Sequence, residues 1–331
     1  MPKVTIEDIS RHTGLSRGTV SRALNDRPDI SDLTKQRVLD ACRELNYVPS
    51  QAARSLATGR TYVVAILVDD LASVEAAEFV RGAGARADAA NYALRVVELG
   101  DGATRQTRLD RVARERIDSM LIAAPLDGAA VALIREALGP RPSAARQPLE
   151  GLACDVFTTD QRESGRLVAR HLLQVAGDAL LYLHAPGRPS AEARLSGFRE
   201  VLEGRGLDAG RMVIDVPPGD GPDTFTNILQ GRLEAVRGIG AADDYLAIGA
   251  MIAAARLGRV PGRDLAVMGQ GNEPASARIR PGLSTTDLTA EEAGQRAMEI
   301  VLQRLEHARL DAPERALLAP TIVARASTRL G

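Results

Sequence analysis

Apolar positions near the N-terminus recur at helical spacing in two short segments separated by Gly14. Thr5 is a candidate N-cap, and Asp8, three residues later, can close a capping box. Ser16 caps a second segment that runs to about Leu24. The positions left facing outward on this second segment are cationic, hydroxylated or small: Arg17, Gly18, Ser21 and Arg22. The pattern predicts a helix-turn-helix, which lays its second helix in the DNA major groove; the alternative is a solvated arginine-rich helix in a small bundle.

A third helix is predicted to begin at Ser31 or Thr34 and to end near Asn46, before Pro49. Its apolar stripe would complete a three-helix core, formed by Val38, Cys42, Leu45, Ile6, Ile9 and Val20. The following segment, 50–61, favours a short helix that is marginal alone in water. We interpret it as a linker that folds on binding.

From Tyr62 onward, β-branched and apolar runs alternate with helical stretches. The predicted helices are Glu75–Ala90 and Arg105–Arg116, and the predicted strands are Tyr62–Val68, Leu94–Leu99, Met120–Ala123, Leu180–His184, Met212–Val216, Ala235–Gly240 and Leu265–Met268. Such alternation indicates parallel sheets with right-handed crossovers. Because one sheet would be large for 270 residues, two lobes are expected, with a ligand between them at the strand carboxyl ends.

Net charge over the 331 residues is only −1, but the distribution is uneven. Residues 1–60 hold ten Lys or Arg and seven Asp or Glu, a net charge of +3 that leaves −4 for the rest. The basic end is therefore the candidate electrostatic footprint on nucleic acid. Cys42 is expected to pack in a core, and neither cysteine belongs to a metal-spaced pattern.

The sequence offers no catalytic motif, so we predict neither an enzyme nor a cofactor or metal site. No signal peptide precedes the first capped helix, and no apolar run approaches the length of a membrane span. These features predict a soluble, cytoplasmic protein without a membrane partner.

Residues 4–61 resemble the headpiece and hinge of the lac repressor family of bacterial regulators. The resemblance is carried, in order and with the family's spacing, by VTIEDISRHTGLSRGTVSRALN, ISDLTKQRVLDACRELNYVPS and AARSLATGRT. It implies a homodimer that binds double-stranded operator DNA at a palindrome, with paired hinge helices in the minor groove and Leu56 wedged into the central step. The DNA-contacting residues expected on this basis are Thr5, Ser16, Arg17, Gly18, Thr19, Ser21, Arg22, Asn25, Ser31, Tyr47, Ala53, Arg54 and Leu56.

The resemblance also implies the α/β fold class: an all-α helix-turn-helix headpiece followed by a two-lobe, periplasmic-binding-protein-like body with parallel sheets. The expected domains are a DNA-binding domain at 1–48, a hinge at 49–61 and an effector-binding and dimerisation domain at 62–331. Three crossings between lobes, near Thr159–Gln161, Ser284–Leu288 and Ala319–Val323, would give lobe one 62–159 and 288–319, and lobe two 161–284 and 320–331.

Three body motifs match the family and put polar residues at the expected rim of the cleft: TTDQRESGRLVARHL, ARLSGF and AADDYLAIGA. The candidate contacts to a small polar effector, a sugar or a sugar-like molecule, are Asp69, Arg162, Arg194, Asp243 and Asn272. Arginine supplies a planar fork of donors, and Asp and Asn accept from hydroxyls. Each residue could instead make a surface ion pair or a helix cap, and Asp243 could simply cap the helix starting near Tyr245.

Three departures from the family weaken the sugar interpretation. Ser73–Ala76 stands where the family commonly has Asn-Pro-Phe-Phe, and Gly269–Asn272 replaces Gly-Phe-Asp-Asp. The segment 141–150 is too polar for the buried strand expected there, and aromatic residues make up only 3% of the chain. An effector-responsive repressor is the leading hypothesis; the alternatives are a DNA-binding regulator whose degenerate cleft takes no effector, and a solute-binding receptor or enzyme with an incidental N-terminal bundle.

Overall fold

The computed structural model describes residues 4–24, 27–47, 55, 58–217, 222–307 and 312–330. The chain divides into two compact units, Met1–Thr61 and Tyr62–Gly331.

The N-terminal unit contains the three predicted helices, α1 Ile6–Thr13, α2 Arg17–Leu24 and α3 Asp32–Glu44. The Asp8 carboxylate accepts the Thr5 backbone N–H at 2.9 Å, and the Ser16 hydroxyl accepts the Thr19 N–H at 3.1 Å. Ser31 is the N-cap of α3, and Asn46 adopts the left-handed conformation (φ 50°) just beyond its C-cap. The predicted caps are thus confirmed. The core comprises Ile9, Val20, Ala23, Val38, Ala41 and Cys42.

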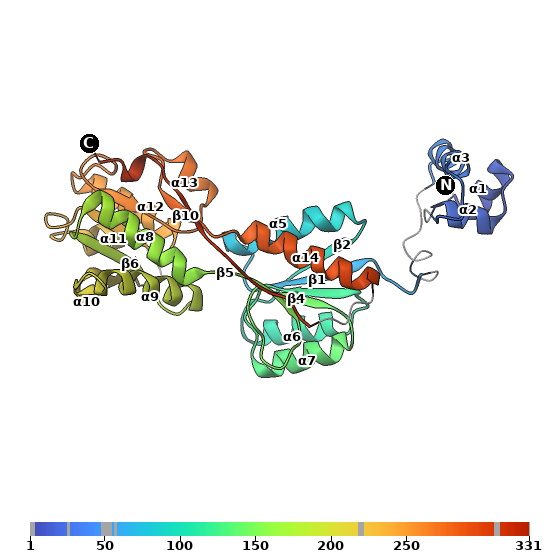
Figure 1. Ribbon diagram of the computed structural model, residues 1–331, viewed down its shortest axis with the longest axis horizontal. Helices are drawn as coiled ribbons and strands as arrows, with labels where there is room; N and C mark the ends of the chain where they lie inside the picture. The colour runs from blue at the N-terminus through green and yellow to red at the C-terminus, as the bar shows by residue number, and fades with distance from the viewer. Residues whose placement is uncertain are drawn as a thin grey trace. The chain divides into compact units, whose positions relative to one another are not determined.

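The second unit contains two parallel sheets (Figure 1). The larger has six strands in the order β11-β5-β4-β3-β1-β2, all paired in parallel: β1 Val63–Val68, β2 Ala93–Glu98, β3 Ser119–Ile122, β4 Ser143–Ala145, β5 Asp155–Thr159 and β11 Arg315–Leu318. Helices α5 Val74–Ala89 and α14 Ala290–His307 cover one face, and α6 Gly102–Ala113 and α7 Gly128–Leu138 cover the other. Because both faces are covered, β1 is buried almost throughout. We call this sheet with its helices lobe one.

Lobe two is built on a four-stranded parallel sheet of order β7-β6-β8-β9: β6 Leu180–His184, β7 Val213–Asp215, β8 Gly238–Ala241 and β9 Ala266–Met268. Its helices are α8 Gln161–Ala176, α9 Pro189–Glu203, α10 Ala209–Met212, α11 Pro222–Leu229, α12 Asp244–Arg256, α13 Pro274–Arg278 and the 3-10 helix η1 Ala326–Thr328. One continuous apolar core joins the sheet to helices α8 to α12. The observed architecture confirms the predicted α/β class with an all-α N-terminal domain.

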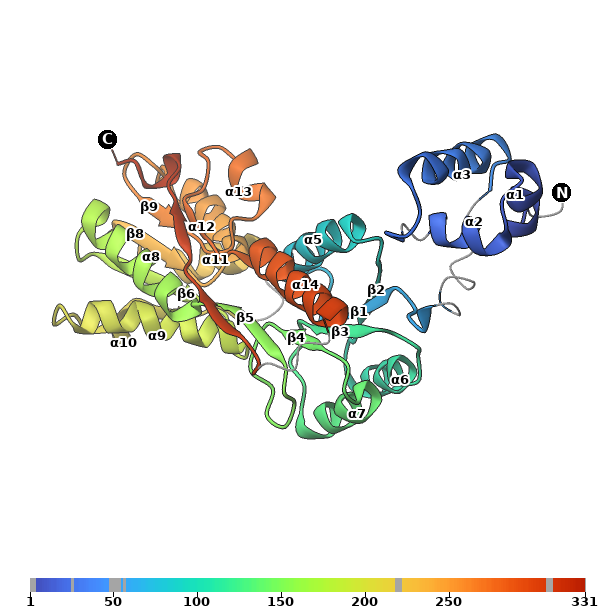
Figure 2. The ribbon, with the colours of Figure 1, turned by 45° about the vertical axis from the view of Figure 1, so that its right-hand side comes forward.

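An antiparallel pair of short strands, β10 Thr285–Asp287 and β12 Thr321–Val323, packs against α8 of lobe two. The C-terminal part of the chain that includes β12 passes between the two lobes (Figure 2). β10 leads from lobe two into α14 of lobe one, and β12 returns the chain from β11 to lobe two. The third passage runs from β5 into α8. Lobe two is therefore attached to lobe one by three neighbouring segments.

The expectation that 141–150 is too polar for a buried strand was wrong. Ser143–Ala145 forms β4, which is buried and lies between β3 and β5. Its side chains are small, and the Ser119 hydroxyl of β3 donates to the carbonyl of Pro142 at 2.7 Å. The polarity of the segment comes largely from the flanking arginines, which lie outside the strand, and Arg146 is paired with Glu75.

In each lobe, two helices cross with their backbones in direct contact at glycine residues. A Cβ on Gly165 of α8 would overlap the carbonyl of Arg194, and one on Gly197 of α9 would overlap the carbonyl of Arg162. In lobe one, a Cβ on Gly82 of α5 would overlap the carbonyl of Glu291 in α14, and a Cβ on Gly294 of α14 would overlap the carbonyl of Phe79 in α5. Only glycine permits these approaches, so the crossings fix how the helices lie on their sheets.

Gly197→Ala is expected to destabilise the chain by about 1–3 kcal/mol, because the obstructing atoms are backbone and cannot move aside as a side chain would. Urea unfolding followed by circular dichroism measures the effect. Gly84→Ala is the matched control, since a Cβ there meets only the Leu94 side chain at 3.8 Å. That control should be neutral or stabilise α5 by up to about 1 kcal/mol. Equal stability of the two variants would contradict the close approach of α8 and α9.

Candidate DNA interface and interlobe site

Helix α2 buries Val20 and Ala23 and leaves Arg17, Gly18 and Arg22 exposed. Arg17 pairs with Glu7 at 3.3 Å, and Arg22 pairs with Asp29 at 3.1 Å, with more than half of every side chain exposed. Exposed pairs of this kind contribute little to stability, so both guanidiniums are available to a DNA ligand at small cost. A Cβ on Gly18 would meet only the Ser16 hydroxyl, at 3.8 Å, so the surface between the arginines is open.

The other DNA-contact candidates of the headpiece make local structure. Ser16 and Ser31 cap α2 and α3, and their hydroxyls lie 2.9 Å from those of Thr19 and Thr34 respectively. Tyr47 is half-buried against the three-helix core. Thr5 is exposed, and Ser21 lies on α2 and is partly exposed. The remaining candidates, Asn25, Ala53, Arg54 and Leu56, lie outside the described residues.

In the body, Arg194 on α9 is the most deeply placed of the effector candidates, with 4% of its surface exposed. Its guanidinium donates to the Gln161 side chain and to the Ala242 carbonyl, each at 2.7 Å. It also forms an ion pair with Glu75, which belongs to α5 of lobe one. Arg194 therefore lies where the lobes meet.

Glu75 was not among the sequence candidates. Its carboxylate also pairs with Arg146 of lobe one at 2.6 Å. Burial on its own would raise the pKa of Glu75, but the neighbouring Arg194 and Arg146 guanidiniums outweigh burial and hold that pKa at about 2. The available signal was the departure at Ser73–Ala76, which puts a carboxylate where the family has aromatic residues.

Asp243 accepts the Leu246 N–H at 2.8 Å and so caps α12, the structural role left open from the sequence. The next residue, Asp244, is completely buried and accepts the Ser276 hydroxyl at 2.7 Å and the Glu273 N–H at 2.8 Å. Burial raises the pKa of Asp244, against these hydrogen bonds. The half-buried Glu273 has its pKa raised to about 7, first by burial and then by the charges of Asp244, Asp243, Glu78 and Glu75.

The Gly269–Asn272 segment is hydrogen-bonded into lobe two. The amide of Asn272 donates to Asp287 at 3.0 Å and accepts from Arg325 at 2.7 Å. Gln270 is completely buried, accepts the Ser164 hydroxyl at 2.6 Å and donates to the Tyr182 hydroxyl at 3.0 Å. The Gln270 amide thus provides hydrogen-bond partners for the buried hydroxyls of Ser164 and Tyr182.

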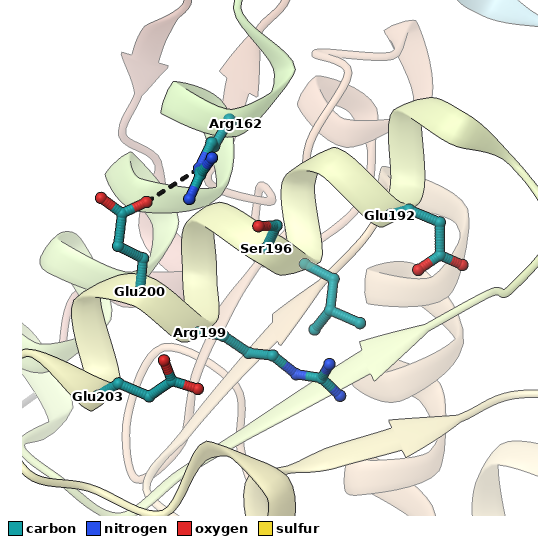
Figure 3. Close-up of a pocket in the computed structure, with 7 residues that line it drawn as sticks. Arg162, Glu192, Ser196, Arg199, Glu200 and Glu203 are labelled. Atoms are coloured by element: carbon teal, nitrogen blue, oxygen red, sulfur yellow. Dashed lines mark hydrogen bonds and ion pairs between the residues drawn. The ribbon is translucent and has the colours of Figure 1, made fainter.

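The structure does not bring Asp69 and Arg162 to Arg194. Asp69 is half-exposed after β1 and pairs with Arg105 at 2.7 Å. Arg162 is more than half exposed and pairs with Glu200 of α9 at 2.9 Å. It lines a shallow pocket of about 330 Å³ whose other residues, Glu192, Leu195, Ser196, Arg199, Glu200 and Glu203, all lie on α9 (Figure 3). Arg162 thus makes a surface ion pair, the alternative role that the sequence left open for it.

The part of the chain that the structure describes contains no group of three or more His, Cys, Asp or Glu residues placed to hold a metal ion. Within the same residues, no helix is both long and apolar enough to cross a membrane.

These features define a helix-turn-helix protein with a two-lobed, periplasmic-binding-protein-like body. The model for bacterial regulatory proteins of the lacI family matches residues 5–50, and the model for periplasmic binding protein-like domains matches residues 169–328. The N-terminal domain is therefore that of a lacI-family bacterial regulatory protein, and the chain has the two parts of a DNA-binding transcriptional regulator.

Several bacterial transcriptional repressors are similar to this chain along nearly its whole length. The ribose operon repressor of Halalkalibacterium halodurans is 26% identical, over 93% of this chain and 92% of its own. The repressor PurR of Mannheimia succiniciproducens is 27% identical, over 92% of both. Among solved structures, a LacI family regulator from Silicibacter pomeroyi is 26% identical (TM-score 0.70; 98% and 99% covered), and the lac repressor dimer bound to operator and the anti-inducer ONPF is 23% identical (TM-score 0.79; both chains covered completely).

Glu273→Gln is expected to flatten the dependence of stability on pH. A carboxyl whose pKa is raised by folding stabilises the native state while it is protonated, and this contribution is lost as pH rises from about 4.5 through about 7. Wild type should therefore lose stability across that window relative to Glu273→Gln, as measured by melting temperatures from pH 5 to pH 8. Glu306→Gln, at an exposed position on α14, is the control and should follow wild type. Parallel profiles for all three proteins would contradict the electrostatic assignment.

Proposed function

We propose that this protein is a repressor that binds a palindromic operator as a homodimer and responds to a small polar effector between its lobes. The observation that carries the proposal is the exposed face of α2, where Arg17 and Arg22 flank an open surface at Gly18. An arginine that donates two hydrogen bonds to guanine is the commonest specific contact in the major groove. A lacI-family headpiece on a two-lobed body supports the same function.

The dimer and the hinge are part of this proposal. The lac repressor neighbour is a dimer bound to operator, and its fold covers this chain completely. We assign DNA binding to 1–48, the hinge to 49–61 with Leu56 as the minor-groove wedge, and effector binding and dimerisation to 62–331. The lobe limits at 159–161, 284–288 and 319–323 follow the passages of the chain between the two sheets. A regulator of this kind works in the cytoplasm, where the DNA lies, and its proposed activity needs no catalysis, cofactor or metal.

The effector is proposed to be a sugar-like polar molecule. Regulators of this family from Enterococcus faecium and Enterococcus faecalis are structurally similar and hold bound ribose, with TM-scores of 0.68 and 0.67. Arg194 and Asp243 lie on neighbouring elements of lobe two, and Arg194 donates to the carbonyl next to Asp243. The second candidate function is DNA binding without an effector, which is favoured by the Glu75 carboxylate already bound to Arg194.

Arg22→Ala is expected to relax sequence preference at one symmetric pair of operator positions, at a cost of about 1–3 kcal/mol per lost bidentate contact. Selection of binding sites from a random DNA pool, at fixed salt, measures the preference. Arg43→Ala is the matched control: Arg43 is likewise an exposed arginine in an ion pair, with Asp40 on α3, and its side chain is 72% exposed against 52% for Arg22. It should lower affinity slightly and leave the selected motif intact. An unchanged motif with Arg22→Ala would refute the assignment of α2 as the reading helix.

A further inference from the structure

Three charged side chains from both lobes meet in the interlobe site. Glu75 and Arg146 belong to lobe one, and Arg194 belongs to lobe two. The side chains are 20%, 17% and 5% exposed, so the cluster is largely removed from water. The Glu75 carboxylate contacts both guanidiniums, one oxygen to each. A single carboxylate therefore links the two lobes.

Each arginine is held in place by its own lobe. Arg194 donates to Gln161 and Ala242, and its backbone is fixed by the glycine crossing of α8 and α9. Arg146 follows β4 directly, and its guanidinium lies 5.8 Å from the centre of the Phe79 ring. Glu75 lies in the first turn of α5, where the helix dipole also favours a carboxylate. The three side chains therefore meet while each is held by the helix or strand that carries or precedes it.

The two guanidiniums can lie together between the lobes because the negative charge of Glu75 lies between them. Without it, two guanidiniums would face each other in a poorly hydrated site, and breaking a buried ion pair by removing one partner is strongly unfavourable. The arginines can regain hydration only if the lobes separate. A carboxylate between the lobes thus acts as a bound ligand acts in a two-lobed protein, since it contacts both lobes in the closed arrangement and only one in an open arrangement.

We propose that Glu75 is a built-in ligand, which holds the two lobes together by binding Arg194 across the cleft, and that Arg146 and Arg194 form a site for a small carboxylate when Glu75 is removed. The inference rests on the proposed function only for its consequence: the chain's own carboxylate favours the closed arrangement of the body, and with it the form of the repressor that closure sets. A molecule that opens the lobes must displace the chain's own carboxylate.

The experiment measures the distance between the lobes in the full-length protein. Spin labels are placed by Arg111→Cys on α6 of lobe one and Arg205→Cys just after α9 of lobe two, both exposed positions, while Cys42 and Cys154 are buried. Labelled protein is diluted with unlabelled protein, so that distances between the protomers of the proposed dimer do not contribute, and the parent protein should then give one short distance population. Glu75→Ala should add a longer population, and sodium formate should return it to the short one, whereas sodium chloride at equal ionic strength should not.

Two further variants make the result specific. Glu115→Ala removes an ion pair with Arg95 that lies entirely within lobe one, and it should leave the distances unchanged. Glu75→Ala combined with Arg146→Ala should open the lobes without recovery in formate. Glu75→Gln keeps the shape of the side chain and loses the charge, so it tests the same point if the alanine variant does not fold.

Identical distance distributions for the parent and Glu75→Gln would overturn the proposal, as would an opened Glu75→Ala single variant that does not close in formate. These outcomes are independent of DNA. Failure of the parent protein to select any operator would overturn the proposed function and leave the built-in ligand standing. If Glu75→Ala opens the lobes and leaves operator affinity unchanged, Glu75 is confirmed as the built-in ligand that holds the lobes together, and closure does not control DNA binding.

Discussion

The backbone contact between α8 and α9 is the constraint on which the interlobe site depends. Because Gly165 and Gly197 lie against the carbonyls of Arg194 and Arg162, the crossing fixes both arginines from their main chains. It turns Arg194 inward to Glu75 and leaves Arg162 on the outer surface with Glu200. In lobe one, Gly294 lies against the carbonyl of Phe79, one turn after Glu75 on α5. Both partners of the interlobe ion pair are thus carried by helices that a glycine crossing clamps in place.

Most of the fold could be predicted from the sequence because its signals are local. A hydroxyl or carboxyl at a helix N-terminus, such as Thr5 or Ser16, stabilises the first turn whatever surrounds it. Runs such as Val63–Val68 are apolar on both faces because the sheet is covered on both sides. Ser143–Ala145 failed this criterion, because its burial comes from the neighbouring strands β3 and β5 and small side chains carry no apolar signal of their own.

The site was less predictable because residue type does not specify a partner. The motif around Arg194 indicated a polar residue at the rim of the cleft, but its partner Glu75 lies 119 residues earlier in the sequence. Arg162 carries the same chemistry one helix away and is exposed, a difference set by the crossing and not by the motif. Asp243 makes the cap that its position before α12 suggested. Local roles could therefore be inferred, whereas pairings between lobes needed the tertiary structure.

The same residue types serve opposite purposes in the two units, and burial decides which. On the headpiece, the pairs of Arg17 with Glu7 and Arg22 with Asp29 are exposed, where water and salt screen each interaction. A phosphate or a guanine can replace such a partner at little cost. In the body, the pair of Arg194 with Glu75 is shielded from water, so replacing either partner leaves a charge that only solvent or another ion can satisfy. An exchangeable arginine suits reading DNA, and a fixed one suits holding two lobes in a defined arrangement.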